Sequence, residues 1–577
     1  MNVIEKPHVL SFWRRWRLNS WGLILGGMMF AVAATPSLLP RDWLFQAMAS
    51  GFSAASGYGL GVFLNWNWRN WGREVAAVFG HKFLKAFAME EEYAALKELT
   101  DFPEKVWFRI EMSLLGVVLI WVTYISVSAV RWQRELHQYM GIPTHFGWEA
   151  LGILPLGLGI WVLILLLVHW MLDLGRLVAR IAPDRWTAAA RSIIATAVAL
   201  GLALWLVDSV IPGTVIRVFE KGAAVTNSAP DPSLKPPKSQ FRSGSEYSFN
   251  RWEGLGSHGS RFVSLGMDGS EIAEVTGEPA KEPIRLFSGL KNGDTPEIQA
   301  DRLVAELHRT QAHERKAVLI AGTTGTGWVN PTAAQSFELL YGGDSAIVAM
   351  QYSNLPSPVQ FVASKDQVHE SGKILVESVL AWRNSLPAEG RPELYLFGES
   401  LGTTQGEGAF SGVKDITRQV DGVLWVGPPN SNELWASLSL RRDPGTREVA
   451  PEFGGGTTVR FAENSRQIGR MLHDDAPWNR PRVLFIQHAT DPIVWWSPNL
   501  LFSQPDWLKE SPGIGRHPSM SWQPLVTFWQ VTLDMANSVS VPTYYGHNYG
   551  TEVLDGLAAI TGYQGDLEPL REALEVY

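Results

Sequence analysis

The sequence predicts an α/β fold with a mostly parallel sheet, preceded by an all-α region that spans a membrane. Three observations indicate this arrangement. Long apolar stretches are concentrated in residues 1–212, a segment rich in Pro and Ser covers residues 213–248, and short apolar runs alternate with helical patterns in residues 249–577. One hydrophobic core rarely serves more than roughly 250 to 300 residues, so this chain of 577 residues needs more than one folded unit. We therefore expect a transmembrane helical domain, a linker and an α/β domain with these boundaries.

The composition argues against several classes of function. The formal net charge is -8 at pH 7, and no run of Lys or Arg is dense enough to bind a phosphate backbone, so we expect no nucleic-acid partner. The chain has no Cys and therefore neither disulfides nor thiolate metal ligands. It lacks a His-Glu-x-x-His motif, and His473 followed by Asp474 and Asp475 is typical of a solvated turn. We expect no metal and no cofactor.

Five apolar stretches in the first part are each long enough to cross a bilayer. A helix of about 20 residues, with a rise of about 1.5 Å per residue, spans a hydrocarbon core of roughly 30 Å. Tryptophans lie near the ends of the stretches, as is typical of membrane–water interfaces. The stretches cover residues 21–39, 43–64, 112–130, 148–172 and 188–211. The first has features of a signal peptide, but we expect it to be retained, since the four other spans hold the chain in the membrane anyway.

Lys and Arg are unevenly distributed among the loops that connect the predicted spans. The N-terminal tail and the second and fourth connections are rich in these residues, whereas the first holds Arg41 and the third holds Arg131 and Arg134. Positively charged loops stay in the cytoplasm. Five crossings from a cytoplasmic N-terminus then place the chain after residue 211 outside the cytoplasm. We predict an integral plasma-membrane protein, with the lipid bilayer as a partner and an extracytoplasmic α/β domain.

Residues 213–248 predict a tether, because they are dense in Pro, Ser and Lys and have almost no periodic apolar positions. Beyond them, five nearly continuous apolar runs are typical of strands buried on both faces of a parallel sheet. These runs cover residues 316–322, 345–352, 393–398, 420–426 and 482–487. Residues 358–386 have helical spacing and predict a crossover helix between two of the strands. Residues 261–265 and 283–286 predict two further strands at the edge of the sheet.

A candidate nucleophile follows the third of these strands. Gly398, Glu399, Ser400, Leu401 and Gly402 form the pattern G-x-S-x-G between a predicted strand and a helix-forming segment. In a nucleophile elbow the serine lies on a strained turn with its hydroxyl above the sheet, and the glycines let neighbouring backbones approach. This context predicts an α/β-hydrolase fold with Ser400 as the nucleophile. The alternative is a glycine-rich turn without chemistry.

A serine hydroxyl is a weak nucleophile and needs a base to take its proton and an acid to orient that base. In this fold the chain order is Ser, then Asp or Glu, then His. Asp491 closely follows a predicted strand, and His547 lies in a glycine-flanked loop before a predicted helix over residues 551–560. We predict a triad of Ser400, Asp491 and His547, although Asp491 also suits an N-cap and His547 a surface loop. Weaker candidates for the acid and the base are Asp474, Asp475, Asp506, Asp534, His369, His488 and His517.

Acyl transfer also needs backbone N–H groups where negative charge develops on the tetrahedral intermediate. We expect one donor to be the N–H of Leu401, which follows the nucleophile. The other should come from the loop after the first central strand, AGTTGTGW, where Thr323 is the first choice and Thr324 the second. This loop lacks the GK[ST] ending of a phosphate-binding loop, so we do not expect a nucleotide there.

Several longer motifs accompany these residues. They are TTGTGWVNP, VAMQYS, FGESLG, GVLWVGPPN, DPIVWWSPNLL, VTFWQV and GHNYG. With them the sequence resembles, over nearly its whole length, a family of bacterial membrane proteins in which a multi-spanning N-terminal domain precedes an α/β-hydrolase domain. The resemblance implies the same roles for Ser400, Asp491 and His547, and it implies attachment to a bacterial plasma membrane.

The predicted site suits hydrolysis of an ester or thioester through an acyl-enzyme on Ser400. A position beside the bilayer and several aromatic residues near the predicted acid favour a small-molecule or lipid ester, such as an acyl ester of the cell envelope, as the substrate. These aromatic residues, which equally suit a hydrophobic core, are Trp495, Trp496, Trp522, Phe528 and Trp529. The alternatives are acyl transfer with the same triad and a non-catalytic membrane scaffold or receptor on a hydrolase fold. Transport is disfavoured because the predicted spans have few ionisable residues near their middle.

Overall fold

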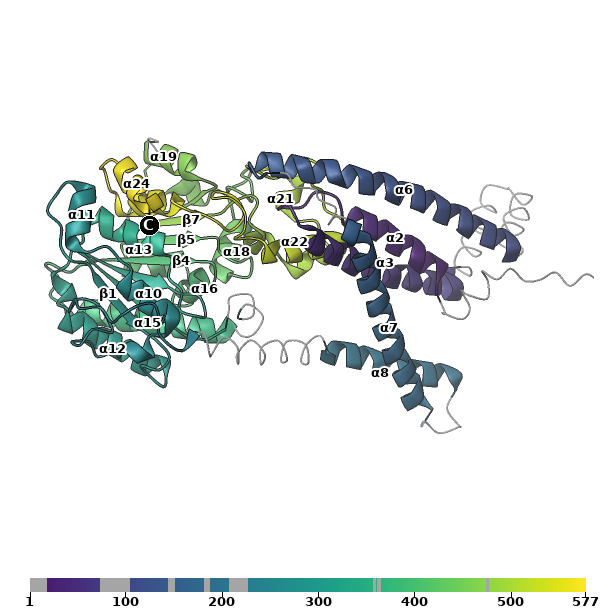
Figure 1. Ribbon diagram of the computed structural model, residues 1–577, viewed down its shortest axis with the longest axis horizontal. Coiled ribbons are helices and arrows are strands. Elements are labelled where there is room, and N and C mark those ends of the chain that lie inside the picture. The colour runs from purple at the N-terminus through teal and green to yellow at the C-terminus, as the bar shows by residue number, and fades with distance from the viewer. Residues whose placement is uncertain are drawn as a thin grey trace, which may run out of the picture. The chain divides into compact units, whose positions relative to one another are not determined.

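The structure is a computed structural model of the protein (Figure 1). It describes residues 18–72, 104–143, 151–180, 187–206, 227–355, 360, 365–473 and 477–576. The chain forms two compact units. We call the first the helical unit, which comprises Met1–Thr196, Pro498–Leu508 and His517–Asn537. We call the second the sheet unit, which comprises Ala197–Ser497, Lys509–Arg516 and Ser538–Tyr577.

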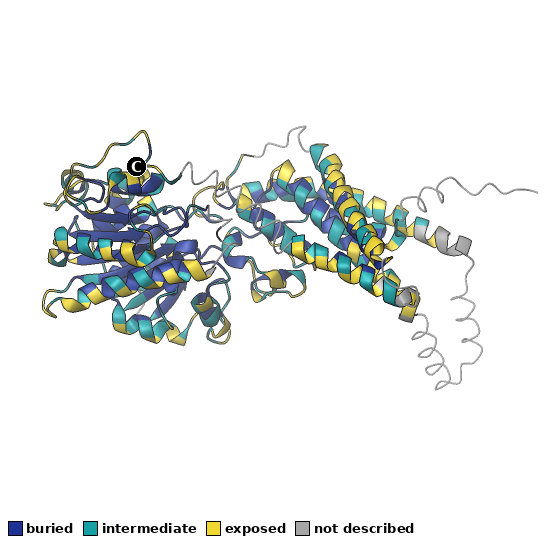
Figure 2. Ribbon diagram, turned by 90° about the horizontal axis from the view of Figure 1, so that it is seen from below, coloured by how far each residue is buried: buried dark blue, intermediate teal, exposed yellow. Residues whose placement is uncertain are grey.

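The sheet unit is built on seven parallel strands in the order β1-β3-β2-β4-β5-β7-β6. The strands are β1 Ile284–Ser288, β2 Ala317–Gly322, β3 Ser345–Met350, β4 Glu393–Glu399, β5 Gly422–Val426, β6 Val459–Ala462 and β7 Arg482–Ile486. Nearly all their residues are buried, as the dark blue strands of Figure 2 show. Parallel strands of this kind need cover on both faces. The five predicted central strands are confirmed as β2, β3, β4, β5 and β7, and the predicted edge strand over residues 283–286 is confirmed as β1.

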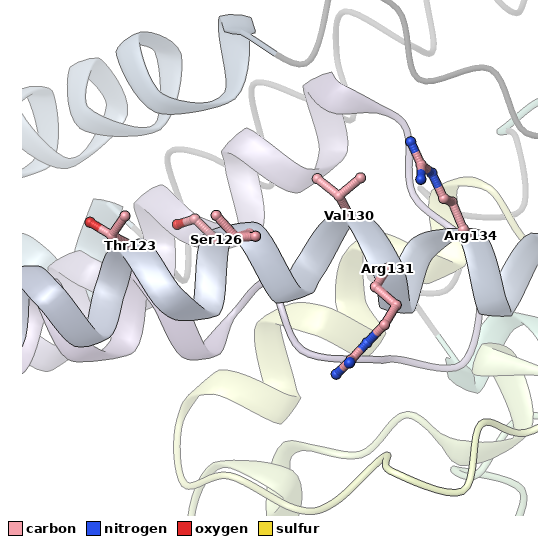
Figure 3. Close-up of a pocket in the computed structure, with 6 residues that line it drawn as sticks. Thr123, Ser126, Val130, Arg131 and Arg134 are labelled. Carbon is pink, nitrogen blue, oxygen red and sulfur yellow. The ribbon is translucent and has the colours of Figure 1, made fainter.

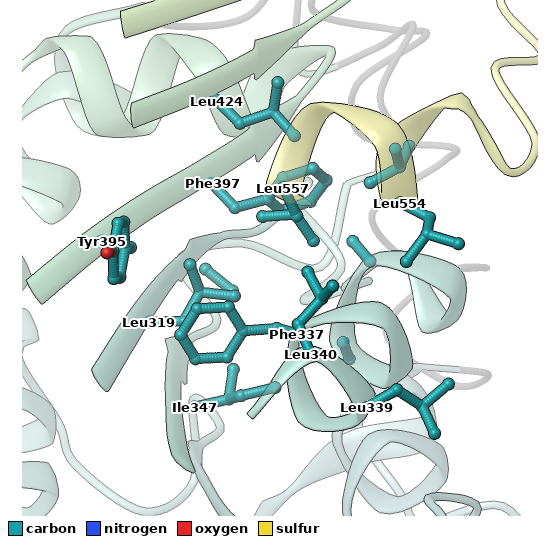
Figure 4. Close-up of a cluster of buried hydrophobic side chains, with 14 of the residues drawn as sticks. Leu319, Phe337, Leu339, Leu340, Ile347, Tyr395, Phe397, Leu424, Leu554 and Leu557 are labelled. Atoms are coloured by element: carbon teal, nitrogen blue, oxygen red, sulfur yellow. The ribbon is translucent and has the colours of Figure 1, made fainter. Parts of the chain in front are cut away.

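Helices cover both faces of this sheet. Those that pack together on one face are α12 Pro296–Arg309, α15 Lys365–Ser385 and α16 Leu401–Glu407, and α15 confirms the predicted crossover helix. Those on the other face are α11 Gly269–Thr276, α13 Pro331–Leu340, α19 Ser465–His473, α23 Glu552–Thr561 and α24 Glu568–Val576. Because strand side chains alternate, Leu319 and Phe397 lie in the core beneath this second face, with Phe337 and Leu557 (Figure 4). The predicted helix over residues 551–560 is confirmed as α23.

Three parts of the sheet unit differ from the sequence-based expectation. Residues 261–265, predicted as a strand, lie in α10 Gly256–Ser264 and the residue after it. A short apolar run has no periodicity that separates a buried strand from a helix, and in α10 Phe262 packs near Phe287 of β1. β6 was not predicted, because Arg460 interrupts its apolar run; the guanidinium lies over the ring of Trp478, 4.8 Å from its centre. α24 was not predicted either.

Described residues of the segment predicted as a linker are bonded to the sheet unit. Residues 207–226, which hold the end of the fifth predicted span and the start of the linker, lie outside the described residues. Farther on, the N–H of Ser243 donates to the carbonyl of Arg285 at 3.0 Å, and the N–H of Arg285 donates to the carbonyl of Phe241 at 3.1 Å. The buried guanidinium of Arg242 pairs with Glu282 at 3.2 Å. The end of this segment is therefore part of the sheet unit, beside β1.

The helices of the N-terminal part are α2 Ser20–Val32, α3 Trp43–Asn67, α6 Glu104–Tyr139, α7 Ile153–Ala179 and α8 Ala188–Trp205. Two described stretches, Met112–Tyr139 and Ile153–Ala179, are long and apolar enough to cross a membrane, as judged from length and composition alone. They correspond to the third and fourth predicted spans. α2 has 13 residues, which is fewer than the about 20 that a span needs. The count of five spans and the orientation stay predictions; the N-terminal tail and parts of the second and fourth connections lie outside the described residues.

Small residues let α2 and α3 pack closely. Gly22 and Gly26 in α2, and Gly57 and Gly61 in α3, are each four residues apart and so share one helix face. A Cβ on Gly61 would lie 2.3 Å from the carbonyl oxygen of Trp21, closer than real Cβ atoms come to other groups. The glycines of the second predicted span therefore serve a helix interface, which explains why this stretch is less apolar than the others.

Candidate active site

Ser400 lies at the junction of β4 and α16. β4 ends at Glu399 and α16 begins at Leu401, so the serine occupies the turn between them. Its backbone has φ 54° and ψ -126°, a conformation that non-glycine residues rarely adopt and that stores strain in a tight turn. Its N–H donates to the carbonyl of Val426 in β5 at 2.9 Å. This geometry is that of a nucleophile elbow.

Gly398 and Gly402 on either side of Ser400 lie where backbones approach closely. A Cβ on Gly398 would lie 2.5 Å from the carbonyl group of Gly402, and a Cβ on Gly402 would lie 2.5 Å from the carbonyl oxygen of Gly322 in β2. Real Cβ atoms essentially never show contacts under 3.0 Å. Glycine is therefore needed at both positions for α16 to pack against β2 and β4.

Asp491 and His547 meet beyond the C-terminal end of β7. Nδ1 of His547 lies 2.6 Å from Oδ2 of Asp491, and both side chains are buried. The other oxygen of Asp491 accepts the N–H of Ile493 at 2.9 Å, so Asp491 is also the N-cap of the short helix α20 Pro492–Trp495. Asp491 therefore both caps α20 and contacts His547, two roles that the sequence left compatible.

Gly427 links this pair to Ser400. It follows β5, whose Val426 is paired with Glu399 of β4, so Gly427 and Ser400 are neighbours at the same edge of the sheet. A Cβ on Gly427 would lie 2.6 Å from Cε1 of His547, and the φ of 54° also favours glycine. The imidazole of His547 therefore lies against the residue beside Ser400. The structure brings the three residues of the predicted triad to one edge of the sheet.

The ring of His547 is placed to accept a proton. Burial disfavours its charged form, but the charge and hydrogen bond of Asp491 and the charge of Glu399 outweigh burial and raise the pKa of His547 above its ordinary value of 6.5. Nε2 is buried and has no hydrogen-bond partner among the described residues. When Nδ1 donates its proton to Asp491, Nε2 of the neutral ring carries a free lone pair. This is the form that a general base requires.

Two family models match the chain. One, described as the Alpha/beta-hydrolase family, matches residues 284–572, and the other, described as the N-terminus of the Alpha/beta-hydrolase family, matches residues 34–266. The chain belongs to this α/β-hydrolase family. The membership confirms the predicted fold, and the first match contains Ser400, Asp491 and His547. Searches of curated proteins and of solved structures gave no match.

In this α/β-hydrolase the predicted oxyanion donors are not equally available. Leu401 begins α16, so its N–H is among the first N–H groups of the helix, which have no partner within the helix. The N–H of Thr323 donates to Oε1 of Gln405 at 2.6 Å. The N–H of Thr324 donates to the carbonyl of Trp328 at 3.1 Å, within a tight turn. Both threonines lie in the predicted loop, yet both of their N–H groups are occupied.

Tyr549 contacts the site and was not identified from the sequence. Its hydroxyl donates to Oδ2 of Asp491 at 2.7 Å, so this oxygen of the acid has two donors. Its ring stacks on His488, with the ring centres 4.0 Å apart. Tyr549 lies two residues after His547, so the motif GHNYG contained the information, but no general rule connects a tyrosine at that spacing with the acid.

His488, a weaker candidate for the base, is engaged at both ring nitrogens. Nδ1 lies 2.8 Å from the carbonyl oxygen of Gly546, and Nε2 lies 2.7 Å from Oε2 of Glu552. Both side chains are buried. His488 therefore holds the backbone directly before His547, and neither of its nitrogens is available to take a proton from Ser400.

Glu399, between Gly398 and Ser400 in the chain, is tied to the loop after β2. One carboxylate oxygen accepts a hydrogen bond from Nδ2 of Asn330. Burial raises the pKa of Glu399, although the charge of His547 and the bond to Asn330 oppose the shift. Asn330 also caps α13, because its Oδ1 accepts the N–H of Ala333 at 3.2 Å. The side chain next to the nucleophile thus fixes the start of α13.

Of the weaker candidates besides His488, His369 lies in α15, and Asp506 lies in the part of the chain assigned to the helical unit. Asp534 and His517 belong to the helical unit, and Asp474 and Asp475 lie outside the described residues. Within the part of the chain that the structure describes, no group of three or more His, Asp or Glu side chains is arranged to hold a metal ion.

Two hollows of this α/β-hydrolase lie elsewhere. One of about 530 Å³ runs along α6 and is lined by residues that include Thr123, Ser126 and Arg131 (Figure 3). The other, of about 970 Å³, lies in the sheet unit, where its lining includes Arg242 and Gln335. Neither hollow is lined by a residue of the predicted triad, so neither identifies a substrate pocket.

Proposed function

We propose that the protein is a serine hydrolase that cleaves ester or thioester bonds, with Ser400 as nucleophile, His547 as base and Asp491 as acid. The observation that carries the proposal is the 2.6 Å contact between Nδ1 of His547 and Oδ2 of Asp491, at the sheet edge that also holds the strained turn at Ser400. Membership of the α/β-hydrolase family supports hydrolase activity in general. The bond type and the triad roles are our inference from the site.

The first half-reaction forms the acyl-enzyme. Nε2 of His547 takes the hydroxyl proton of Ser400 while Oγ attacks the acyl carbonyl carbon. The carbonyl oxygen becomes an oxyanion, which the N–H of Leu401 stabilises, and the N–H of Thr323 becomes a second donor once Gln405 releases it. The ester C–O bond or thioester C–S bond then breaks, and His547 gives its proton to the leaving alcohol or thiol.

The second half-reaction frees the enzyme. Water, deprotonated by Nε2 of His547, attacks the acyl carbon, and Ser400 leaves with the proton returned from the imidazolium. Asp491 keeps the proton on Nδ1 throughout and stabilises the positive ring. If an alcohol or amine takes the place of water, the same steps transfer the acyl group.

The substrate class that we propose is a lipid or cell-envelope acyl ester, used at a membrane. Support comes from the two long apolar helices of the N-terminal part. Two of the aromatic residues that the sequence suggested for this substrate give no such support, because they serve packing within their own units. Trp495 is buried against Trp435 at 6.1 Å between ring centres, and Trp529 stacks on Phe52 at 4.9 Å.

A fluorophosphonate probe tests the nucleophile directly, because it phosphonylates only an activated serine. The full chain in detergent should be labelled, and so should the control Ser411→Ala, which alters an exposed serine beyond α16. Ser400→Ala should not be labelled. An unlabelled wild type, or equal labelling of Ser400→Ala, rules the proposal out.

A non-catalytic scaffold or receptor on the same fold is the second candidate. One observation favours it: the N–H groups of Thr323 and Thr324 are both occupied, which leaves the oxyanion site with the donor at Leu401. A scaffold predicts neither labelling by the probe nor turnover of any acyl ester. Labelling at Ser400 together with release of a fluorescent alcohol from an ester excludes it.

A further inference from the structure

The larger of the two hollows, with a volume of about 970 Å³, is lined by residues of the sheet unit. Its lining comes mainly from the end of the segment predicted as a linker, the turn between α10 and α11, the start of α13, and α24. We call it the α13 hollow. No residue of the predicted triad lines it, so the proposed reaction gives it no role.

Gln335 of α13 is a buried amide without a partner. Its side chain lines the α13 hollow, and the residue is only 4% exposed. In the part of the chain that the structure describes, neither the nitrogen nor the oxygen of this amide makes a hydrogen bond. Nearly all buried polar side chains of native proteins have a partner, and a glutamine amide can both donate and accept. Gln335 therefore indicates a ligand that supplies the partner.

The start of α13 adds a second donor on the same helix face. Thr332 lies three residues before Gln335 and also lines the hollow. Pro331 has no N–H, and the N–H of Ala333 donates to Oδ1 of Asn330 at 3.2 Å. Among the described residues, the N–H of Thr332 has no such acceptor. A free N–H at the start of a helix attracts an anionic group, because the helix dipole is positive there.

The lining also contains a cation that is available to a ligand. Lys238 is exposed, lines the α13 hollow and forms no ion pair with any described residue. Arg242, by contrast, is fully engaged. Its guanidinium donates to Glu282 at 3.2 Å and to backbone carbonyls at the end of α10 and just beyond it. Arg242 and Glu282 thus neutralise each other, which leaves Lys238 to meet a carboxylate.

Two carboxylates of α11 and its cap line the hollow as well. Asp268 and Glu271 are exposed and form the capping box of α11. The hydroxyl of Ser270 and the N–H of Glu271 hold the pKa of Asp268 below its ordinary value, so this carboxyl group is ionised at neutral pH. Besides the pair of Arg242 and Glu282, the lining therefore carries two negative charges and one positive charge. This balance disfavours a polyanion such as a nucleotide and favours a ligand with both a carboxylate and an ammonium group.

The size and the apolar part of the lining favour a peptide over a single amino acid. Pockets of roughly 300 to 1,000 Å³ hold drug-sized molecules, and the α13 hollow has about 970 Å³. Leu265, which is half exposed, and Leu574 add apolar surface. Both features suit a short peptide with apolar side chains.

We propose that the α13 hollow binds a small zwitterion, namely a short peptide with free ends. Its carboxylate accepts the N–H of Thr332 and an amide N–H of Gln335. Its ammonium group pairs with Asp268 and Glu271. This binding site is separate from the predicted triad and does not depend on the proposed function.

The test is isothermal titration calorimetry of the full chain in detergent, with leucyl-leucine as the probe. Blocking either end of the peptide, as in N-acetyl-leucyl-leucine and leucyl-leucinamide, should weaken binding about tenfold or more, because charge-assisted hydrogen bonds are lost. Gln335→Leu should weaken binding of leucyl-leucine to a similar extent. It should also raise the thermal midpoint, because the unpartnered amide is gone, whereas a folding defect would lower it. Lys414→Gln, at an exposed position in α17 Val413–Gln419, is the control and should bind as the wild type does.

Two further variants test which end of the peptide each wall holds. Asp268→Asn keeps the helix cap, since asparagine caps about as well as aspartate, but it removes a charge. It should weaken binding of leucyl-leucine and leave that of N-acetyl-leucyl-leucine unchanged. Lys238→Gln should weaken binding of leucyl-leucine and leave that of leucyl-leucinamide unchanged.

The inference is wrong if leucyl-leucine does not bind, if either blocked peptide binds as tightly, or if Gln335→Leu binds like the wild type. It is also wrong if neither Asp268→Asn nor Lys238→Gln weakens binding. Tighter binding of inorganic phosphate than of leucyl-leucine would make the hollow an anion site and equally overturn it. Labelling of Ser400 plays no part in these measurements, so failure of the proposed function is a distinct outcome.

Discussion

The hydroxyl of Tyr549 lies 2.7 Å from Oδ2 of Asp491, the same oxygen that Nδ1 of His547 approaches to 2.6 Å. Two donors on one oxygen hold the carboxylate in place, where it orients the imidazole and stabilises its positive form. Burial and the nearby charge of Asp491 raise the pKa of Tyr549 itself. The tyrosine therefore stays protonated and is a constant donor to the acid.

Tyr549→Phe should slow acyl-enzyme formation about tenfold to a hundredfold, because it removes a hydrogen bond to a charged group at a cost of roughly 1.5 to 3 kcal/mol. The measurement is the labelling rate with a fluorophosphonate probe. Tyr563→Phe, at a partly exposed tyrosine after α23, is the control and should keep the wild-type rate. If Tyr549→Phe labels as fast as the control, the acid does not need this donor.

The rate of labelling should rise with pH through a midpoint above 6.5, because His547 acts as a base only when neutral and its pKa is raised. Asp491→Asn removes the charge that raises this pKa, so its midpoint should lie lower and its plateau should fall by about 10⁴. The raised pKa has a second effect. Protonated His547 stabilises the fold at pH values below 6.5, and this contribution is lost as the pH rises through the raised pKa. If the labelling rate of the wild type reaches its midpoint below pH 6.5, the prediction for His547 is wrong.

Gly402→Ala should lower the thermal midpoint and abolish labelling, because the new Cβ meets the carbonyl oxygen of Gly322 at 2.5 Å. Forcing a methyl group into packed backbone costs about 1 to 3 kcal/mol. The control is Gly469→Ala in α19, a helix position where a new Cβ would meet no atom within 4 Å. Alanine in such an open helix position should stabilise by roughly 0.5 to 1 kcal/mol. If Gly402→Ala and Gly469→Ala have equal thermal midpoints, glycine is not needed at position 402 for packing.

Glu407 at the end of α16 predicts a dependence of stability on pH. Burial raises its pKa to about 8, while Asn432 and the first N–H groups of α18 Glu433–Leu440 oppose part of the shift. A carboxyl group with a raised pKa contributes stability that is present below its ordinary value of 4.5 and is lost as the pH rises through about 8. The thermal midpoint should therefore fall across this interval in the wild type.

Glu407→Gln should flatten that dependence and be more stable than the wild type at alkaline pH, since an amide carries no charge to bury. Glu389→Gln, at an exposed position, should follow the wild-type curve. Calorimetry or a dye-based melt at several pH values measures both. A Glu407→Gln curve that falls as steeply as the wild type assigns the pH dependence to another group.

Features encoded locally were predictable from the sequence. Continuous apolar runs located the central strands to within about two residues, because strands covered on both faces tolerate few polar side chains. The pattern around Ser400 located the strained turn, because strand, glycines and helix occur together there. The chain order Ser, Asp, His then identified Asp491 and His547 as candidate partners of Ser400. The structure places these two residues in contact.

Features that depend on distant side chains were not predictable. Gln405 occupies the N–H of Thr323 from a position 82 residues away, and no local pattern indicates this. Asp534 was considered only as a weaker acid candidate, since its partner Arg41 lies in a different part of the chain. The run over residues 261–265 became a helix because its packing against β1, not its composition, decides its conformation.

The apolar side of α22 Val526–Ala536 has a practical consequence for producing this protein. A fragment that begins in the linker contains Ser400, Asp491 and His547, yet it leaves Val526 and Leu533 without the alanines that cover them. Such a fragment should be poorly soluble even though no predicted membrane span remains in it. Production for crystallisation or inhibitor screening is better based on the entire chain, or on a version whose residues 498–537 have been redesigned with a polar surface.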